Sequence, residues 1–286
     1  MTSAAAPVVG FVGLGNIGGA MARRLLGVPG GLVVHDVRPE ATEPFVAEGA
    51  RAAALATLAR DCDVISVVVL TDAQAREVVH SLLTHARPGT VVAVHSTVET
   101  GTAPELAVAA AAAGVDLLDA PVSGGALGAA DGRLAVMVGG ERAAYERAKP
   151  VFAHWASLVL HVGEVGAGTQ TKLARNLLSF AGFAAAAEAQ CLAEAAGLDL
   201  TKLAAVVRHS DAITGGPSAV MIRRETGRLA DDDGLRPIFE HTRTLGEKDL
   251  ALALALGDEL DVPLPFARLA HQHLAAALGV PHEEES

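Results

Sequence analysis

Six residues near the start of the chain, Gly13-Leu14-Gly15-Asn16-Ile17-Gly18, constrain its fold more than any other stretch. They follow an apolar run from Val8 to Val12 and precede a segment with helical spacing of its apolar residues. In a strand–turn–helix unit the first glycine makes the tight turn, the second leaves room beside the backbone, and the third lets helix and strand pack closely. The helix N-terminus then presents free N–H groups, which bind phosphates. Residues 13–18 are therefore predicted to hold the pyrophosphate of a dinucleotide.

Short apolar runs alternate with amphipathic stretches through the first half of the chain. The runs expected to be strands are Val8–Val12, Leu32–His35, Val64–Val69, Val91–Val94 and Val115–Leu118, and two more that extend the set are Leu134–Val138 and Leu158–Val162. The helical stretches between them include Ala20–Leu26, Ala73–Leu83 and Pro104–Ala113. This alternation predicts βαβ units, and hence an α/β fold with a Rossmann-type, doubly wound parallel sheet.

The pattern changes after Gly163. From Thr169 to Ala196 apolar residues recur at three- and four-residue spacing without a proline, which predicts one long helix. Further helices are expected near Leu200–His209, Thr242–Gly257 and Pro265–Leu278. We expect a dinucleotide-binding Rossmann domain over residues 1–163 and an all-helical domain for substrate binding and dimerisation over residues 164–286, joined by a long interdomain helix. A chain of 286 residues has the length of two domains.

Charge and composition exclude several classes of partner. The formal net charge of −11 argues against nucleic acid and against an anionic membrane, since both bind a concentrated basic surface. Met1–Pro7 lacks the basic start and apolar core of a signal peptide. The two cysteines, Cys62 and Cys191, show neither zinc spacing nor a disulfide framework. His271 and His273 are two residues apart on an expected helix and point in different directions. We therefore expect a cytoplasmic protein with no metal site.

Asp36 stands at the end of the second expected strand. A carboxylate at this place accepts hydrogen bonds from the adenosine ribose hydroxyls and repels a 2′-phosphate, so it predicts NAD rather than NADP as the cofactor. Arg38 leaves NADP open, because a guanidinium can partner a 2′-phosphate. The alternative role for Asp36 is to cap the next helix.

Three further stretches complete a pattern: Asp119-Ala120-Pro121-Val122-Ser123-Gly124-Gly125, then residues 163–176 with Lys172-Leu173-Ala174-Arg175-Asn176, and finally Lys248-Asp249. Together with the glycine motif, and from about Val9 to Leu278, they resemble the β-hydroxyacid dehydrogenase family, which includes 3-hydroxyisobutyrate dehydrogenase and tartronate semialdehyde reductase. The resemblance implies an oxidoreductase that transfers a hydride between a nicotinamide cofactor and a small β-hydroxy acid substrate.

Lys172 and Asn176 are four residues apart on the expected long helix, so both project from one face. A lysine acts as a general acid or base when burial or a neighbouring cation lowers its pKa. Asparagine can orient a hydroxyl or a carboxylate without adding charge. From the residues alone, a surface lysine with a polar neighbour is the alternative. The resemblance implies that Lys172 and Asn176 are both catalytic and that both bind the substrate.

The resemblance also assigns the remaining site residues. Ser123, Gly124 and Gly125 are expected to bind the substrate carboxylate through a hydroxyl and backbone N–H groups, with Ser123 and Gly124 counted as catalytic. The residues expected to contact the cofactor, besides residues 13–18 and Asp36, are Val69, Leu70, Thr71, Thr97 and Lys248. The alternatives are a plain turn at residues 123–125 and an ordinary surface lysine at position 248.

The long helix bears on assembly, because Gly182 and Ala184–Ala187 present small side chains that permit close approach of another backbone. The resemblance implies a homodimer or a larger homo-oligomer, and an intramolecular core helix is the alternative. His209–Gly216 matches no known pattern, so the acid stays open: the candidates are 3-hydroxyisobutyrate, glycerate or tartronate semialdehyde, 3-hydroxypropionate, and equally another acid. Two other functions stay open: an imine reductase, a group that typically replaces the lysine at position 172, and a non-catalytic dinucleotide-binding protein.

Overall fold

A computed structural model describes residues 6–282 of the chain. Residues 1–5, which form most of the segment tested for a signal peptide, and residues 283–286 lie outside the described part. By their contacts the residues form two compact units, one up to Arg175 and one from Asn176 onward. The division into domains after Gly163 stays a prediction. No helix within residues 6–282 is long and apolar enough to cross a membrane.

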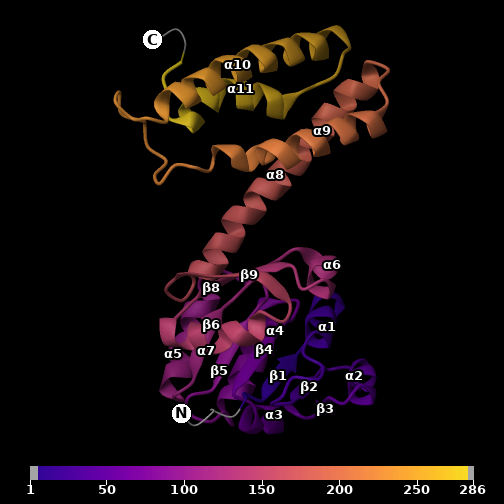
Figure 1. The fold of residues 1–286 in the computed structure, drawn as a ribbon, viewed down its shortest axis with the longest axis vertical. Coiled ribbons are helices and arrows are strands. Elements are labelled where there is room, and N and C mark those ends of the chain that lie inside the picture. Colours follow the sequence, from indigo (N-terminus) through magenta and orange to yellow (C-terminus); the bar gives the residue numbers. More distant parts are fainter. Residues whose placement is uncertain (1–5, 283–286) are drawn as a thin grey trace. The chain divides into compact units, whose positions relative to one another are not determined.

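A nine-stranded sheet forms the centre of the first unit (Figure 1). Its strands are β1 (Val9–Val12), β2 (Leu32–His35), β3 (Arg51–Ala52), β4 (Val64–Val67), β5 (Val91–Val94), β6 (Asp116–Asp119), β7 (Val122–Ser123), β8 (Leu134–Gly139) and β9 (Ala156–Gly163). Their order is β3-β2-β1-β4-β5-β6-β8-β7, with β9 also paired to β8. The predicted α/β architecture is confirmed.

One edge of this sheet is mixed. The strands from β3 to β6 are parallel to their neighbours, whereas β8 runs antiparallel to β6 and β7 and parallel to β9. The reversal follows from the chain between β7 and β8, where Gly124 and Gly125 both have positive φ and turn the backbone into a short helix instead of a crossover.

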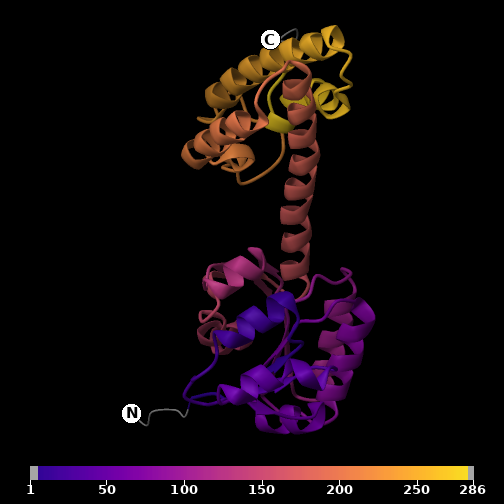
Figure 2. The ribbon, with the colours of Figure 1, turned by 90° about the vertical axis from the view of Figure 1, so that its right-hand side faces the viewer.

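Helices cover both faces of the sheet (Figure 2). They are α1 (Asn16–Arg23), the 3₁₀ helix η1 (Pro39–Ala41), α2 (Glu43–Ala47), α3 (Leu55–Asp61), α4 (Asp72–Leu83), α5 (Thr102–Ala112), α6 (Gly125–Ala130) and α7 (Arg142–Phe152). Successive β1 residues show the two layers: Phe11 packs in a cluster with Phe152 and Trp155, and Val12 in another with Leu58. A strand buried on both faces needs a continuous apolar run, which explains the sequence of β1.

Several elements differ from the expectation. β4 ends at Val67 rather than Val69, because the backbone of Val69 bonds to the side chain of Ser96 instead of a strand. The helix expected over Ala20–Leu26 begins earlier, at Asn16, directly after the glycine turn. The sequence did not predict α7, whose last turn contains Pro150, a residue that usually interrupts helices.

The second unit is helical, as expected. Its elements are the part of α8 (Ala167–Ala195) from Asn176 onward, α9 (Leu200–Thr214), the 3₁₀ helix η2 (Gly216–Val220), α10 (Arg236–Glu259) and α11 (Pro265–Leu278). α10 and α11 lie side by side (Figure 1). Glu188 accepts hydrogen bonds from the N–H groups of Phe266 and Ala267 at 2.7 and 3.0 Å, and so caps the start of α11. A small core cluster includes Phe239 and Leu278.

Candidate active site

The turn between β1 and α1 contains three glycines, Gly13, Gly15 and Gly18. They differ in whether the surrounding protein leaves room for a side chain. Gly13 has φ +92°, and a Cβ there would lie 1.9 Å from the carbonyl oxygen of Val68. A Cβ on Gly18 would lie 2.1 Å from the carbonyl oxygen of Gly13. A Cβ on Gly15 would meet no atom of the described residues within 4 Å. The fold itself requires Gly13 and Gly18, whereas Gly15 borders open space.

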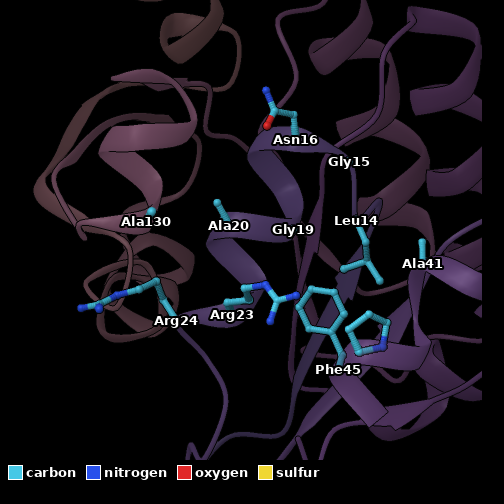
Figure 3. A pocket seen from close by; sticks show the side chains of 11 residues that line it. Leu14, Gly15, Asn16, Gly19, Ala20, Arg23, Arg24, Ala41, Phe45 and Ala130 are labelled. Atoms are coloured by element: carbon cyan, nitrogen blue, oxygen red, sulfur yellow. The ribbon is translucent and has the colours of Figure 1, made fainter. Parts of the chain in front are cut away.

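That open space fits a phosphate. α1 begins at Asn16, and its first turn carries no acidic residue and no side-chain cap from Gly15. The first N–H groups of a helix have no intrahelical partner, and a phosphate at the N-terminus accepts them. A cavity of about 490 Å³ opens beside the turn. In Figure 3, Asn16 lies toward one end of it and Arg23 lies against the ring of Phe45, 5.1 Å from its centroid. Residues 13–18 therefore suit a pyrophosphate.

Asp36 follows β2 and lies against the glycine turn. Its Oδ2 accepts the N–H of Leu14 at 2.7 Å, and its Oδ1 accepts the N–H of Arg38 at 2.9 Å. The Nε of Arg38 lies 3.4 Å from the same Oδ1. Burial alone would raise the pKa of Asp36, but these N–H groups and the guanidinium outweigh it and lower the pKa. The result is an ionised carboxylate beside the turn.

The hydroxyl of Ser96, which follows β5, forms hydrogen bonds with the backbone of Val69, which follows β4. Ser96 donates to the carbonyl oxygen of Val69 at 2.7 Å and accepts the N–H of Val69 at 2.9 Å. The Oε1 of Gln74 accepts the N–H groups of Leu70 and Thr71 at 3.0 and 3.2 Å. The side chains of Ser96 and Gln74 thus hold the backbone of residues 69–71 by hydrogen bonds. Leu70 itself is 93% exposed.

Ser123, Gly124 and Gly125 stand between β7 and α6. Gly124 has φ +130° and Gly125 has φ +66°, values that only glycine adopts without strain. A Cβ on Gly125 would meet no described atom within 4 Å. The segment offers a partly exposed hydroxyl on Ser123 and exposed glycine backbone, which are groups that bind a carboxylate.

Lys172 lies in the second turn of α8 and reaches β7. Its Nζ donates to the carbonyl oxygen of Val122 at 2.7 Å, directly before Ser123 in the chain. Burial lowers the pKa of Lys172, and the positive charge of Arg175 lowers it further. Arg175 is three residues away on the same helix, a spacing that places two side chains on one face. A lysine with a lowered pKa therefore lies against β7, at the residue before Ser123.

Two predicted site residues belong to the second unit. Asn176 stands on α8 as the first residue of that unit. Lys248 lies on α10, where its exposed Nζ is 3.1 Å from the carboxylate of Asp249. A cavity of about 670 Å³ in this unit includes Lys248 and His271 among its lining residues. The roles of Asn176 and Lys248 stay predictions.

Most predicted residues of the first unit gather at one edge of the sheet. Parallel strands end at the same edge, where α/β proteins bind ligands. The residues placed there are residues 13–18, Asp36, Val69, Leu70, Thr71, Thr97, Ser123, Gly124 and Gly125. The bonds of Ser96 and the effect of the Arg175 charge were not predicted from the sequence, although the three-residue spacing of Arg175 from Lys172 was a usable signal. Within residues 6–282, no three His, Cys, Asp or Glu residues could hold a metal ion.

Two family models match the chain. Residues 8–163 match the NAD binding domain of 6-phosphogluconate dehydrogenase. Residues 166–285 match the model described as NAD-binding of NADP-dependent 3-hydroxyisobutyrate dehydrogenase. The first match contains the glycine turn and Asp36. The nicotinamide dinucleotide expected from these residues is thereby confirmed as the cofactor type.

Similar proteins cover nearly the whole chain. An uncharacterized oxidoreductase of Mycobacterium tuberculosis is 56% identical over 97% of this chain and 95% of its own length. A 3-hydroxyisobutyrate dehydrogenase of Pseudomonas aeruginosa is 33% identical over 92% of this chain and 89% of its own. A crystal structure from Mycobacterium avium 104, 56% identical, covers 96% of this chain and 100% of that one, with a TM-score of 0.92. The chain therefore belongs to the β-hydroxyacid dehydrogenase family of NAD(P)-dependent oxidoreductases.

Proposed function

We propose that this chain oxidises a small β-hydroxy acid, such as 3-hydroxyisobutyrate, with NAD as the hydride acceptor and Lys172 as the general acid and base. The observation that carries the proposal is the position of the Lys172 Nζ, 2.7 Å from the carbonyl oxygen of Val122. Burial and the charge of Arg175 lower the pKa of Lys172. A lysine whose pKa lies closer to the working pH is a better proton acceptor.

Each residue of the site has a part in this reaction. Ser123 and the N–H groups of residues 124–125 bind the substrate carboxylate, and Asn176 orients the substrate. Lys172 accepts the proton of the β-hydroxyl as the carbonyl forms. The dinucleotide, when bound, supplies the hydride acceptor. In the opposite direction the Lys172 ammonium donates its proton to the oxygen of the carbonyl that is being reduced.

Asp36 supports NAD over NADP. Its carboxylate is ionised, and the N–H groups of Leu14 and Arg38 hold it at the glycine turn. A negative charge there repels a 2′-phosphate and accepts ribose hydroxyls. The exposed side chain of Arg38 leaves some use of NADP open.

We also propose that the enzyme is a cytoplasmic homodimer or larger oligomer. The second unit exposes many large apolar side chains, among them Leu177, Phe180, Phe183, Val206 and Leu252. Exposed apolar surface of this extent marks an interface. The proposal includes a small-molecule substrate and no nucleic-acid partner. The net charge of −11 is consistent with this, because nucleic acid binds basic surfaces.

The test is nicotinamide absorbance with the purified protein and each candidate: 3-hydroxyisobutyrate, 3-hydroxypropionate and glycerate for oxidation, and tartronate semialdehyde for reduction, with NAD and NADP separately. Lys172→Ala should remove turnover and keep NAD affinity. Lys149→Ala, which removes an exposed lysine on α7, is the control and should change neither. Turnover that persists in Lys172→Ala would contradict the assignment of that lysine.

A further inference from the structure

Asp119, the last residue of β6, holds the N-terminus of α8. Its side chain is buried, with 1% of the residue exposed. One carboxylate oxygen accepts the N–H of Gly166 and the other accepts the N–H of Thr169, each at 2.7 Å. Thr169 is the third residue of α8, so its N–H belongs to the first turn, which has no intrahelical acceptor. Both carboxylate oxygens therefore accept hydrogen bonds from backbone N–H groups at the start of α8.

Two glycines let the carboxylate and the helix approach so closely. A Cβ on Gly139, which pairs with Asp119 across β6 and β8, would lie 2.3 Å from the Oδ1 of Asp119. A Cβ on Gly168 would lie 2.4 Å from the backbone oxygen of Asp119 and 3.0 Å from its Oδ2. The carboxylate, β8 and the first turn of α8 are thus packed without room for another carbon.

A second bond joins the same two segments. The Nζ of Lys172, three residues beyond Thr169, donates to the carbonyl oxygen of Val122, three residues beyond Asp119. The segment from Asp119 to Ser123 therefore holds α8 at two points, by its backbone N-terminus and by the side chain of Lys172. If the helix end shifted or turned, the Nζ would leave its place beside β7.

We propose that Asp119 is a positioning residue, which fixes the start of α8 so that the Lys172 Nζ lies beside β7 and the carboxylate-binding segment. This inference rests on the proposed function for its kinetic consequence. The two bonds explain why the residue is an aspartate: asparagine has only one acceptor oxygen, and its NH₂ would face a second N–H. Burial raises the pKa of Asp119, and the N–H groups of Thr169 and Gly166 oppose this rise by binding the carboxylate.

The kinetic test compares Asp119→Asn with Asp116→Asn, a change on the same strand whose carboxylate pairs with Arg147 on α7. Asp119→Asn should lower kcat by about 10²-fold, the loss that a displacement of about 1 Å produces, while the KM for NAD stays within about twofold. Asp116→Asn should leave both constants unchanged. An unchanged kcat in Asp119→Asn overturns the proposal, and so does an equal loss in the control.

A second experiment asks whether Asp119 acts through Lys172. Turnover of Lys172→Ala is rescued with methylamine, which supplies an amine that the helix does not position. Adding Asp119→Asn to Lys172→Ala should then cause no further loss, because effects through one residue are not additive. A further loss as large as that in the wild-type background would show that Asp119 acts elsewhere, and would overturn the proposal.

A labelling experiment separates this inference from the proposed reaction, because it needs no substrate. Reductive methylation of Lys172 and Lys149 is followed by mass spectrometry in the full chain. Asp119→Asn should speed labelling of Lys172 several-fold relative to Lys149, and unchanged labelling overturns the inference whatever the turnover. Faster labelling in a protein that turns over no acid would refute the proposed reaction and support the placement by Asp119. If Asp119→Asn does not fold, Asp119→Ser, which is smaller and keeps one acceptor, takes its place under the same criteria.

Discussion

The carboxylate of Asp36 and the backbone N–H of Leu14, 22 residues apart, are joined by a hydrogen bond of 2.7 Å. The bond orients the carboxylate at the glycine turn. Asp36→Asn keeps an acceptor for Leu14 and removes the charge that repels a 2′-phosphate. The ratio of kcat/KM with NAD to kcat/KM with NADP should fall by about tenfold or more, which corresponds to about 1.4 kcal/mol.

Steady-state kinetics with both cofactors measure this ratio. Arg38→Ala is the companion variant, because the guanidinium of Arg38 lies 3.4 Å from the carboxylate of Asp36. It should lower any use of NADP and leave use of NAD nearly unchanged. A ratio that is the same in Asp36→Asn and the wild type would remove Asp36 from cofactor selection.

Gly15 and Gly18 form a matched pair for testing what each glycine does. Gly15 has φ −66°, which alanine adopts, and its Cβ would enter open space. Gly15→Ala should therefore keep the melting temperature and weaken NAD binding by about tenfold or more. Gly18→Ala places a Cβ 2.1 Å from the carbonyl oxygen of Gly13. It should destabilise the fold by about 1–3 kcal/mol, the usual cost of overpacking.

Thermal melting and calorimetric titration with NAD distinguish the two effects. The pair would count against the phosphate site if Gly15→Ala bound NAD as tightly as the wild type. It would count against the packing argument if Gly18→Ala melted at the wild-type temperature.

The charge of Arg175 should contribute to the pKa of Lys172, and so to the pH at which Lys172 works. Burial first, and Arg175 second, lower the pKa of Lys172. Arg175→Gln removes the second cause and should raise that pKa. Oxidation requires neutral Lys172, so its rate rises as the pH passes through this pKa, and the rising limb should move to higher pH in the variant. Reduction requires the ammonium, so its falling limb should also move to higher pH.

The pH profiles of kcat/KM in both directions check this prediction. Arg60→Gln, an equal loss of charge on an exposed position of α3, is the control and should leave the profiles in place. Profiles of Arg175→Gln that coincide with those of the wild type would show that the titrating group is not Lys172.

Those parts of the fold could be predicted whose sequence pattern lies within a single strand, turn or helix. The glycine turn, the apolar runs of β1, β2 and β5, and α11 all follow from patterns within a few residues. The direction of β8 could not be predicted, because it depends on the φ angles of two glycines between β7 and β8. The hydrogen bonds of Asp119 could not be predicted either, since its two donors lie 47 and 50 residues further along the chain. No periodicity connects such groups before the sheet brings them together.

His95 should make the stability of the first unit depend on pH. Its ring is buried against Phe152 and Trp155. Its Nδ1 donates to the carbonyl oxygen of Ala120 at 2.7 Å, and its Nε2 lies 3.1 Å from the hydroxyl of Ser66. Because a carbonyl can only accept, the neutral ring carries its proton on Nδ1 and accepts from Ser66. Burial lowers the pKa of His95 to about 4.

The sign of this effect follows from proton binding. Between pH 6.5 and 4 the unfolded chain binds a proton on His95 and the folded chain does not, so stability is lost as the pH falls. The loss between pH 6.5 and 5 should be about 1.6 kcal/mol. Urea denaturation at the two pH values measures it. His95→Asn should lower stability at both and reduce the difference between them, whereas an equal difference would place the titration in other groups.

Phe180 and Phe183 on α8 should anchor the contact between subunits. Both side chains belong to the second unit, are 63% and 67% exposed, and pack edge to face with 5.7 Å between their centroids. Aromatic side chains of this size dominate the energetics of interfaces. Replacing both with Asp places two charges on the exposed apolar surface, and the double variant should be monomeric at micromolar concentrations at which the wild type is an oligomer.

Sedimentation velocity measures the assembly directly. Val108→Asp, which replaces an exposed apolar residue on α5 in the first unit, is the control and should leave the oligomer intact. Because the second unit has few buried apolar side chains of its own, the double variant should also melt at a lower temperature, since it loses the burial that a partner provides. A wild-type protein that sediments as a monomer would contradict the proposed assembly, and a dimer that survives both charges would place the interface on another face.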